Sequence, residues 1–182
     1  MSSNQQHPVT VQPLDEFITA LSVEKRTKYN EIIRSMKLPS SVFEDYSSWC
    51  DESYTRNCIV ENEKFELILL CWKAGQITPI HDHGGEECWV KIIEGEFRET
   101  IYTADKSGEL KVVKSMISKS NDVTYMIDFM GFHSIENLSS KKSMSLHLYA
   151  KPIRSCNIFD ENSRKFVNKD LTYDTASPLV TI

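Results

Sequence analysis

The pattern of apolar positions changes near residue 51 and divides the chain into two regions. Before that point, apolar residues recur at helical spacing. The clearest stripe, at i, i+3, i+4 and i+7, consists of Tyr29, Ile32, Ile33 and Met36. Such a stripe is typical of an amphipathic helix that buries one face. We expect helices over residues 14–21, 23–36 and about 40–49, with Ser22 as the N-cap of the second.

After residue 51 the apolar segments become short, β-branched and aromatic, and turn residues separate them. Strands are predicted over residues 57–61, 65–73, 76–81, 88–94, 97–103, 110–116, 122–127, 132–137 and 143–150. Many short strands at regular spacing are typical of an antiparallel barrel or jelly roll. We therefore expect a mainly β protein with one domain over residues 1–182, in which a helical layer (about 13–50) packs on a β-barrel (about 51–170).

Length, charge and cysteine usage narrow the class of protein. A chain of 182 residues has the size of one ordinary domain, and its net charge of −5 argues against nucleic acid as a partner. No apolar run reaches the roughly 20 residues that span a membrane, and the first residues lack the basic-then-apolar order of a signal peptide. Five cysteines without a C-x-x-C pair indicate reduced thiols. We expect a cytoplasmic monomer.

The stretch from residue 75 to 95 carries the strongest chemical signal. It holds two of the five histidines, His81 and His83, and side chains two apart on a strand point to the same side. Gly84 and Gly85 supply a turn before the next strand, which predicts a hairpin with both imidazoles at its mouth. An isolated H-x-H pair is more often a surface or packed pair than a metal site, so the context has to decide.

A third histidine, His133, lies in a later strand-like segment, GFHSIEN. A strand that crosses the barrel opposite the hairpin would bring three neutral imidazole nitrogens to one point. Such a set holds Fe(II), Zn(II), Cu(II) or Ni(II). Three protein ligands leave coordination positions open, as in a reactive rather than a structural site.

In its motifs the chain resembles the cupins. The spacing G-x5-H-x-H-x4-C-x6-G, which ends at Gly95, is similar to the first cupin motif, with Cys88 where most cupins have a ligand Glu. His133 and Asn137 resemble the H-x3-N of the second motif. The stretch that leads to this His, MIDFMGFH, lacks the Pro of that motif. Within the cupins, the chain resembles the cysteine dioxygenase family over roughly residues 40–170. The motifs that carry this resemblance are YTRN (54–57), LCW (70–72), HDH, GFHSIEN and SLHLY (145–149).

This resemblance implies a non-haem Fe(II) centre held by His81, His83 and His133 without a carboxylate. A substrate thiolate, its amine and O2 would use the open positions, and a protein carboxylate would disfavour the anionic thiolate. Glu87, beside Cys88, is the competing ligand candidate. On a regular strand it points to the opposite face, so we do not expect it to bind the metal.

The resemblance also implies roles for residues on a later strand. In the mammalian-type family, the positions of Cys88 and Tyr149 form a thioether crosslink, and the Tyr149 hydroxyl would orient substrate and oxygen. His147 lies two residues earlier on the same strand face and would hold that hydroxyl; the alternative is an ordinary core histidine. Residues 150–152, Ala-Lys-Pro, replace the family's Ser-Pro-Pro with its cis bond. The turn that positions Tyr149 is therefore expected to differ.

Arg56, with Tyr54 beside it, is the substrate-binding residue that the resemblance implies. A guanidinium can pair in a bidentate way with the carboxylate that an α-amino acid leaves free when it binds through sulfur and nitrogen. We expect an Fe(II)-dependent enzyme that oxidises L-cysteine with O2 to cysteine sulfinic acid. One alternative is a dioxygenase for another small thiol such as 3-mercaptopropionate, whose relatives tend to have Gln in place of Arg56. The other is a non-catalytic metal-binding cupin.

Overall fold

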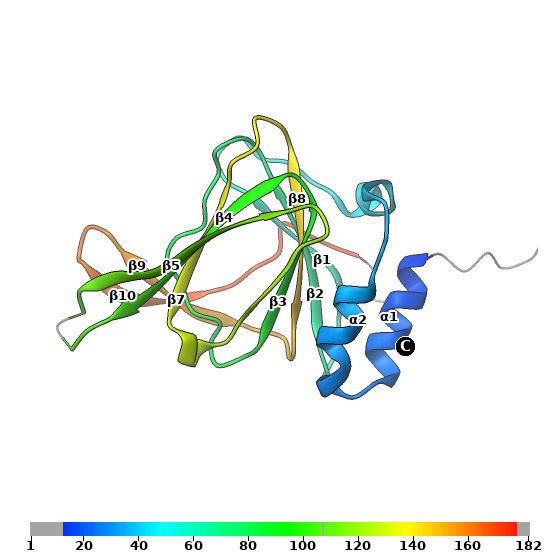
Figure 1. Ribbon diagram of the computed structural model, residues 1–182, viewed down its shortest axis with the longest axis horizontal. Helices are drawn as coiled ribbons and strands as arrows, with labels where there is room; N and C mark the ends of the chain where they lie inside the picture. The colour runs from blue at the N-terminus through cyan, green and yellow to red at the C-terminus, as the bar shows by residue number, and fades with distance from the viewer. Residues whose placement is uncertain (1–12, 107, 178–182) are drawn as a thin grey trace, which may run out of the picture.

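A helical layer packs against a β-barrel in the computed structural model of the chain (Figure 1), which describes residues 13–106 and 108–177. The α-helices are α1 (Pro13–Val23) and α2 (Tyr29–Ser35), and short 3₁₀ helices span Arg26–Lys28, Ser40–Tyr46 and Asp128–Met130. The strands are β1 (Thr55–Glu61), β2 (Glu66–Trp72), β3 (Cys88–Glu94), β4 (Glu96–Ala104), β5 (Leu110–Lys119), β6 (Val123–Met126), β7 (Phe132–Asn137), β8 (Ser143–Tyr149), β9 (Ser155–Asp160), β10 (Lys165–Asp170) and β11 (Thr175–Ala176).

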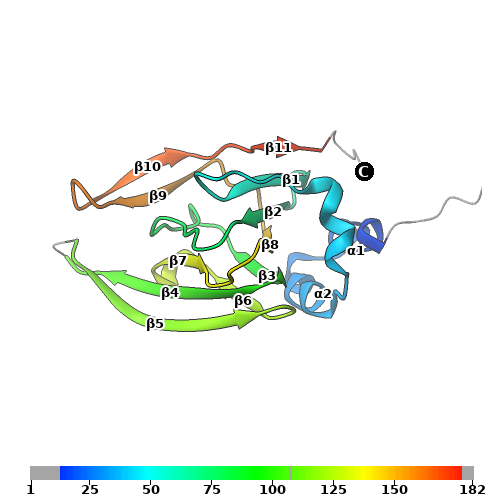
Figure 2. The ribbon, with the colours of Figure 1, turned by 90° about the horizontal axis from the view of Figure 1, so that it is seen from above.

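The described strands form three sheets. A six-stranded sheet has the order β11-β1-β2-β8-β3-β6, a three-stranded sheet has the order β5-β4-β7, and β10 pairs with β9. The pairings are antiparallel, except that β1 and β11 run parallel. Seen from above, β9, β10 and β11 run along one side, β4 and β5 along the other, and the helices lie at one end (Figure 2). The expected cupin-type, mainly β barrel with an N-terminal helical layer is confirmed.

The central strands β2 and β8 are buried along their whole length, because both faces of their sheet are covered. Alternate side chains of β2 serve different cores. Leu67 and Leu69 pack with the helices, whereas Ile68 and Leu70 belong to the cluster inside the barrel. Burial on two sides explains why β2 reads as an unbroken apolar run, ELILLCW, rather than as an alternating one.

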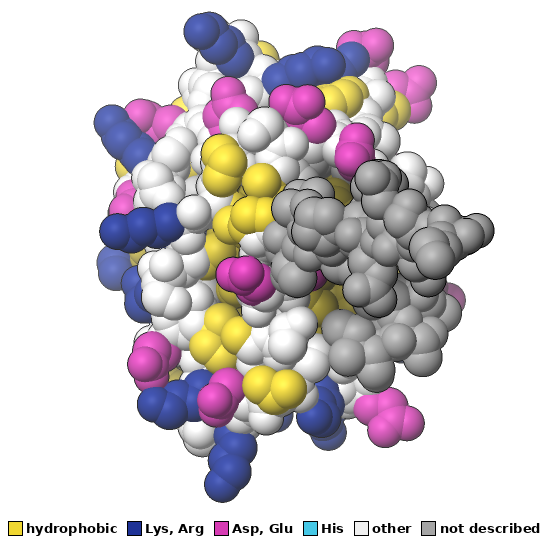
Figure 3. Space-filling view, turned by 90° about the vertical axis from the view of Figure 1, so that its right-hand side faces the viewer, with side chains coloured by type: hydrophobic (Ala, Val, Ile, Leu, Met, Phe, Trp, Pro, Cys, Tyr) yellow, Lys and Arg dark blue, Asp and Glu magenta, His cyan; other side chains and the backbone are white. Residues whose placement is uncertain are grey.

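The surface at the helical end is mixed in charge. Acidic and basic side chains are interspersed around the rim of the face that carries the helices (Figure 3). This mixture differs from the one-sign basic face of a nucleic-acid-binding protein. Within residues 13–106 and 108–177, no helix is long and apolar enough to cross a membrane.

The helix boundaries differ from the expected ones. Ser22 is not an N-cap: it lies within α1, and its hydroxyl donates to the carbonyl of Ile18, 2.8 Å away. The first helix runs on to Val23 because its apolar stripe stays buried to the last turn. The second α-helix begins only at Tyr29, after a 3₁₀ turn whose N-cap position carries no side-chain hydrogen bond.

The predicted strand over residues 76–81, and the hairpin that it would form with β3, are wrong. This segment makes only isolated bridges, one of them between His81 and His133, while β3 pairs with β8 and β6. Pro79 has no backbone N–H, so the segment cannot continue a ladder. The strands β9, β10 and β11 are missing from the prediction. The sequences of β10 and β11 are largely exposed, and β9 has only two fully buried positions, which are three residues apart.

Gly131, directly before β7, has a backbone that only glycine adopts readily, with φ 109° and ψ −145°. A Cβ there would also overlap the carbonyl oxygen of Tyr102 on β4. We expect Gly131→Ala to lower the free energy of unfolding by about 3 kcal/mol or more, measured by urea denaturation. The matched control is Gly108→Ala, because Gly108 also has a positive φ but nothing lies near its would-be Cβ; it should cost about 1–2 kcal/mol. Equal losses in the two variants would contradict the overlap argument.

Candidate metal centre and pocket

Three histidines from two separate segments converge inside the barrel. His133 lies on β7, and the backbones of His81 and His133 exchange two hydrogen bonds, with N···O distances of 3.0 and 2.9 Å. One ring nitrogen from each of His81, His83 and His133 lies within 4.8 Å of the others. The structure therefore brings together the three ligands that the sequence predicts, although through a bridge to β7 and not through a hairpin.

Hydrogen bonds fix which ring nitrogens are free. Nδ1 of His81 lies 2.9 Å from the carbonyl oxygen of Pro79, and Nδ1 of His133 lies 2.7 Å from a carboxylate oxygen of Glu99. Because these oxygens accept, both Nδ1 atoms carry the proton, and each Nε2 keeps its lone pair. The Nε2 atoms of His133 and His83 are 2.9 Å apart. Nδ1 of His83 is buried without a partner, and the short distance between the two Nε2 atoms fits ligation of one cation by both rings.

Burial keeps His81 and His83 neutral. It lowers the pKa of His81 to about 3, with His133 adding to the effect, and it lowers the pKa of His83 well below the usual value. Metal ligands have to be deprotonated, so these imidazoles are ready to bind at neutral pH. Three neutral nitrogens fit a first-row divalent metal such as iron, zinc, copper or nickel.

The sequence prediction missed Glu99, which orients His133. On β4 the buried positions alternate, and Glu99 occupies one of them between Phe97 and Ile101, with 4% of its surface exposed. A charged side chain on the apolar face of a strand is the signal that could have found it. Hydrogen bonds of this kind fix the ring orientation of a ligand histidine and raise its basicity.

The segment that carries His81 and His83 is anchored on both sides. The Asp82 carboxylate accepts from the backbone N–H and the side-chain amide of Asn157 on β9, at 2.8 and 2.7 Å. The Asp128 carboxylate accepts from the backbone N–H of His83, at 2.8 Å, and from that of Gly85. These bonds replace the strand ladder that the segment lacks and hold the two rings in place.

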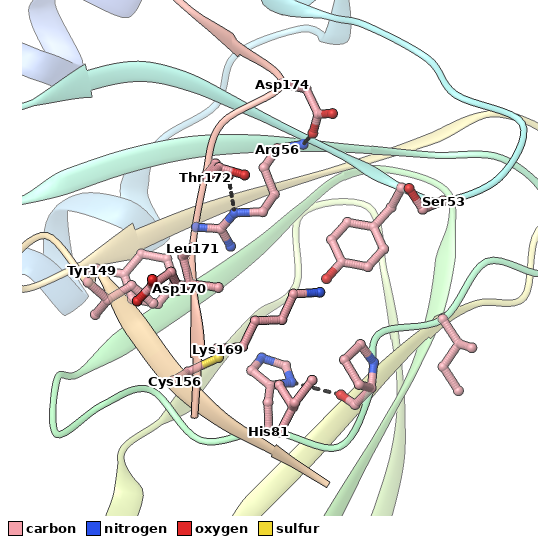
Figure 4. Close-up of a pocket in the computed structure, with 15 residues that line it drawn as sticks. Ser53, Arg56, His81, Tyr149, Cys156, Lys169, Asp170, Leu171, Thr172 and Asp174 are labelled. Atoms are coloured by element: carbon pink, nitrogen blue, oxygen red, sulfur yellow. Dashed lines mark hydrogen bonds between the residues drawn. The ribbon is translucent and has the colours of Figure 1, made fainter. Parts of the chain in front are cut away.

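Next to the histidines lies a cavity of about 360 Å³, which His81, Tyr149, Tyr54 and Arg56 help to line (Figure 4). Arg56 on β1 donates from Nε to the carbonyl of Thr172, 3.2 Å away. Its Nη2 is buried and has no hydrogen-bond partner. Buried guanidinium nitrogens are normally satisfied, so a free one that borders a cavity points to a missing acceptor.

Tyr54 belongs to the walls of this cavity, and His147 lies behind them in a hydrogen-bonded chain. Tyr54 stacks on Trp72, with ring centroids 4.6 Å apart. Trp72 donates from Nε1 to the hydroxyl of Ser145, and that hydroxyl lies 2.9 Å from Nε2 of His147. Burial and the charge of Arg56 lower the pKa of His147 well below its usual value, so the ring is neutral.

The expected role of His147 is only partly supported by its contacts. Its Nε2 lies beside Ser145 and not beside the hydroxyl of Tyr149, and the rings of His147 and Tyr149 stack with centroids 6.4 Å apart. A neutral ring whose Nε2 accepts carries its proton on Nδ1. No hydrogen bond of the described residues joins His147 to the Tyr149 hydroxyl, so support of Tyr149 by His147 stays a prediction.

Cys88 and Tyr149 are direct cross-strand partners on β3 and β8. The Tyr149 ring also lies beside the metal ligands, with its centroid 5.5 Å from that of His83. Burial raises the pKa of the Cys88 thiol and of the Tyr149 hydroxyl well above their usual values. Both groups therefore keep their protons at neutral pH, and the Tyr149 hydroxyl can donate a hydrogen bond.

The turn after Tyr149 continues the pairing of β8 and contains trans peptide bonds. Residues 150–152 do not carry a cis bond, and none is found in the described part of the chain. The backbone N–H of Ala150 donates to the carbonyl of Glu87, which extends the ladder by one residue. The Glu87 side chain points away from the histidines, toward Tyr125 and Arg26, as expected for the opposite strand face.

A family model and individual relatives with similar sequences point to the same family. The sequence model of the family described as "Cysteine dioxygenase type I" matches residues 1–162. The human protein "Cysteine dioxygenase type 1" is 34% identical over 122 residues, which cover 65% of this chain and 61% of the human protein. The Danio rerio protein of the same name is 37% identical over 116 residues, 60% of this chain and 57% of that protein. The chain thus spans about three fifths of the length of these relatives.

Solved structures with similar folds are more distant in sequence. A Klebsiella pneumoniae protein with a double-stranded β-helix domain is 13% identical, with a TM-score of 0.49, and the match covers 70% of this chain and 94% of that one. A cupin protein from Desulfovibrio desulfuricans is 20% identical, with a TM-score of 0.46, over 65% of this chain and 99% of that one.

The contact between Glu99 and His133 leads to a metal-binding prediction. Glu99→Gln removes the charge that orients the ring, and we expect the affinity for Fe(II) or Zn(II) to fall about 10- to 100-fold. Competition with a chelating indicator under anaerobic conditions measures this. His133→Ala should abolish binding of one ion per chain.

The matched control for this experiment is Glu136→Gln on β7, because Glu136 pairs with Arg98 outside the cavity. It removes the same charge and should leave metal affinity unchanged. Native affinity in Glu99→Gln would show that Glu99 does not support the metal site, and full metal occupancy in His133→Ala would remove His133 from the ligand set.

Proposed function

The chain belongs to the cysteine dioxygenase type I family, and from this premise we propose that it is an Fe(II)-dependent thiol dioxygenase. The substrates would be L-cysteine and O2, and the product would be cysteine sulfinic acid. The curated relatives carry the name cysteine dioxygenase type 1, and the group of His81, His83 and His133 supports a metal cofactor.

The observation that carries the substrate assignment is the buried, unpaired Nη2 of Arg56. Arg56 lines the same cavity as His81 and Tyr149. A carboxylate that reaches this guanidinium would satisfy the free donor in a charge-assisted hydrogen bond. The thiol end of such a substrate would then face the three histidines, which is the arrangement that oxidation at sulfur requires.

The donor set suits a bound Fe(II). When bound, the ion would supply open coordination positions for a thiolate and an amine and would activate O2. Three neutral imidazoles leave its full positive charge to attract an anionic thiolate, because no carboxylate ligand offsets that charge. The reaction adds both oxygen atoms of O2 to the sulfur of the thiol, so no external reductant is needed.

The remaining residues would orient the reactants. The hydroxyl of Tyr149 keeps its proton, because burial raises its pKa, and would donate a hydrogen bond to substrate or oxygen. His147 would support that hydroxyl through its Nδ1 proton, and Tyr54 would form the wall beside the carboxylate. The cysteines in the described residues are free thiols, which supports our proposal of a cytoplasmic enzyme, acting as a monomer.

We further propose that Cys88 and Tyr149 form a thioether bond. Their direct pairing across β3 and β8 supports it. Forming the bond joins the Cys88 sulfur to a ring carbon of Tyr149 and removes the thiol hydrogen and one ring hydrogen, with O2 as the oxidant. The bond would hold the tyrosine ring in one position beside His83.

The role of Arg56 can be tested with a small panel of thiols. A charge-assisted contact in a partly buried pocket is worth about 1.5–3 kcal/mol. Arg56→Ala should therefore reduce kcat/KM for L-cysteine roughly 10- to 150-fold, measured by oxygen uptake. Cysteamine, which lacks the carboxylate, should be a poor substrate that is insensitive to the change. Arg56→Lys should also be impaired, because it loses the planar fork.

Arg98→Ala is the matched control, since Arg98 pairs with Glu136 at the surface and its loss should not alter turnover. A native preference for cysteamine would refute the carboxylate contact. A native preference for 3-mercaptopropionate would keep the contact but change the substrate. A native protein that oxidises no thiol would refute the proposed function.

The crosslink can be detected by intact mass. A fraction of active native protein should be lighter by two hydrogens, about 2 Da, and this species should be absent from Cys88→Ala. Cys71→Ala is the control, because Cys71 is also buried but packs on the helical side of β2; it should retain the light species. Cys88→Ala should keep its metal and measurable turnover. Loss of the metal from Cys88→Ala would instead make Cys88 a ligand.

A further inference from the structure

A second cation lines the cavity and has no part in the function proposed above. Lys169 lies near the end of β10 and is exposed, yet it belongs to the walls of the cavity that holds Arg56 and His81. Its side chain extends across the cavity between the guanidinium of Arg56 and the ring of His81 (Figure 4). An exposed lysine usually extends into solvent. The ammonium of Lys169 lies toward the cavity instead, and this orientation needs an explanation.

The fold fixes where Lys169 enters. It is the cross-strand partner of Cys156 on β9, and paired side chains of an antiparallel ladder lie on the same face. Cys156 is buried and lines the same cavity. After β10 the chain is tied to Arg56, which donates to the Thr172 carbonyl and whose own carbonyl accepts from the N–H of Asp174. Lys169 and Arg56 are therefore held on one continuous wall.

The charge of Lys169 is available to a ligand. Among the ion pairs of the described residues, none includes Lys169. Two aspartates also line the cavity. The carboxylate of Asp174 already accepts from the backbone N–H of Arg56, at 2.8 Å, and Asp170 follows Lys169 on the strand.

The effect of this charge reaches inside the cavity. Burial raises the pKa of the Cys156 thiol to about 11. The Lys169 ammonium is among the groups that oppose this rise. A charge that acts on a buried thiol of the wall acts on a bound ligand too.

Building on the thiol dioxygenase function, we propose that Lys169 is a specificity-determining residue that binds the substrate carboxylate together with Arg56. Arg56 offers a fixed planar fork, and Lys169 adds a mobile point charge from the mouth of the cavity. The carboxylate of Asp174 is held by the backbone N–H of Arg56, whereas the two cations face the ligand, so thiols with a carboxylate are favoured over thiols whose only charged group is an amine. The pocket therefore takes anionic or zwitterionic thiols and rejects cationic ones.

The test is a change in the ratio of two substrates. Lys169→Gln should reduce kcat/KM for L-cysteine roughly 3- to 10-fold, mainly through KM, because the contact is partly exposed. For cysteamine, kcat/KM should stay constant or rise. The effect should shrink in 0.5 M salt, where exposed charges are screened, and Lys169→Arg should preserve the native ratio. Lys165→Gln removes the same charge from the same strand, outside the cavity, and should change neither value.

Two outcomes separate this inference from the proposed function. If the native protein oxidises L-cysteine and Lys169→Gln leaves the ratio of the two substrates unchanged, Lys169 does not set specificity. If the native protein oxidises no thiol, the proposed function fails. The role of Lys169 is then tested by the binding of L-cysteine. Anaerobic calorimetry with L-cysteine should then give a Kd that rises 3- to 10-fold in Lys169→Gln and not in Lys165→Gln; equal Kd values would overturn the inference.

Discussion

The site depends on one short piece of backbone pairing, the two hydrogen bonds between His81 and His133. The segment before His81 is not a strand, and Pro79 prevents it from becoming one. Asp82 and Asp128 hold the segment that follows Pro79, and these two bonds fix its position against β7. With them, imidazoles that lie 50 residues apart in sequence share one point, and the proton positions of their rings are set by Pro79 and Glu99.

The barrel buries the residues around this pair of hydrogen bonds and holds them in place. The helices cover the outer face of the central sheet. The inner face of the sheet is therefore free to carry the residues of the site. That inner face carries Tyr149, His147 and Ser145 from β8 and Trp72 from β2, joined by hydrogen bonds and ring contacts. The same burial that stabilises the fold thus keeps the imidazoles neutral and the phenol protonated.

Local spacing in the sequence predicted the parts of the site that local geometry determines. The alternation of His147 and Tyr149 follows from strand periodicity, whereas His81 and His83 lie outside a strand and come together through the bridge to His133. The alternation of β4 could have marked Glu99 as a buried charge, but neither its partner His133 nor the position of Lys169 could be predicted, because the pairing order of the strands is not contained in any one segment. The strands β9 and β10 were not predicted for a second reason: β10 is exposed at nearly every position, and the buried residues of β9 are not spaced two apart.

Asp82, which stands between two metal ligands, links the hairpin of β9 and β10 to the metal centre through Asn157. The wall that this hairpin gives to the cavity is therefore not an interchangeable loop. A lineage that altered the hairpin to admit a different thiol would have to keep Asn157, or it would loosen the very residues that hold the metal. We therefore expect related proteins to differ in single side chains of this hairpin and to keep its length and register.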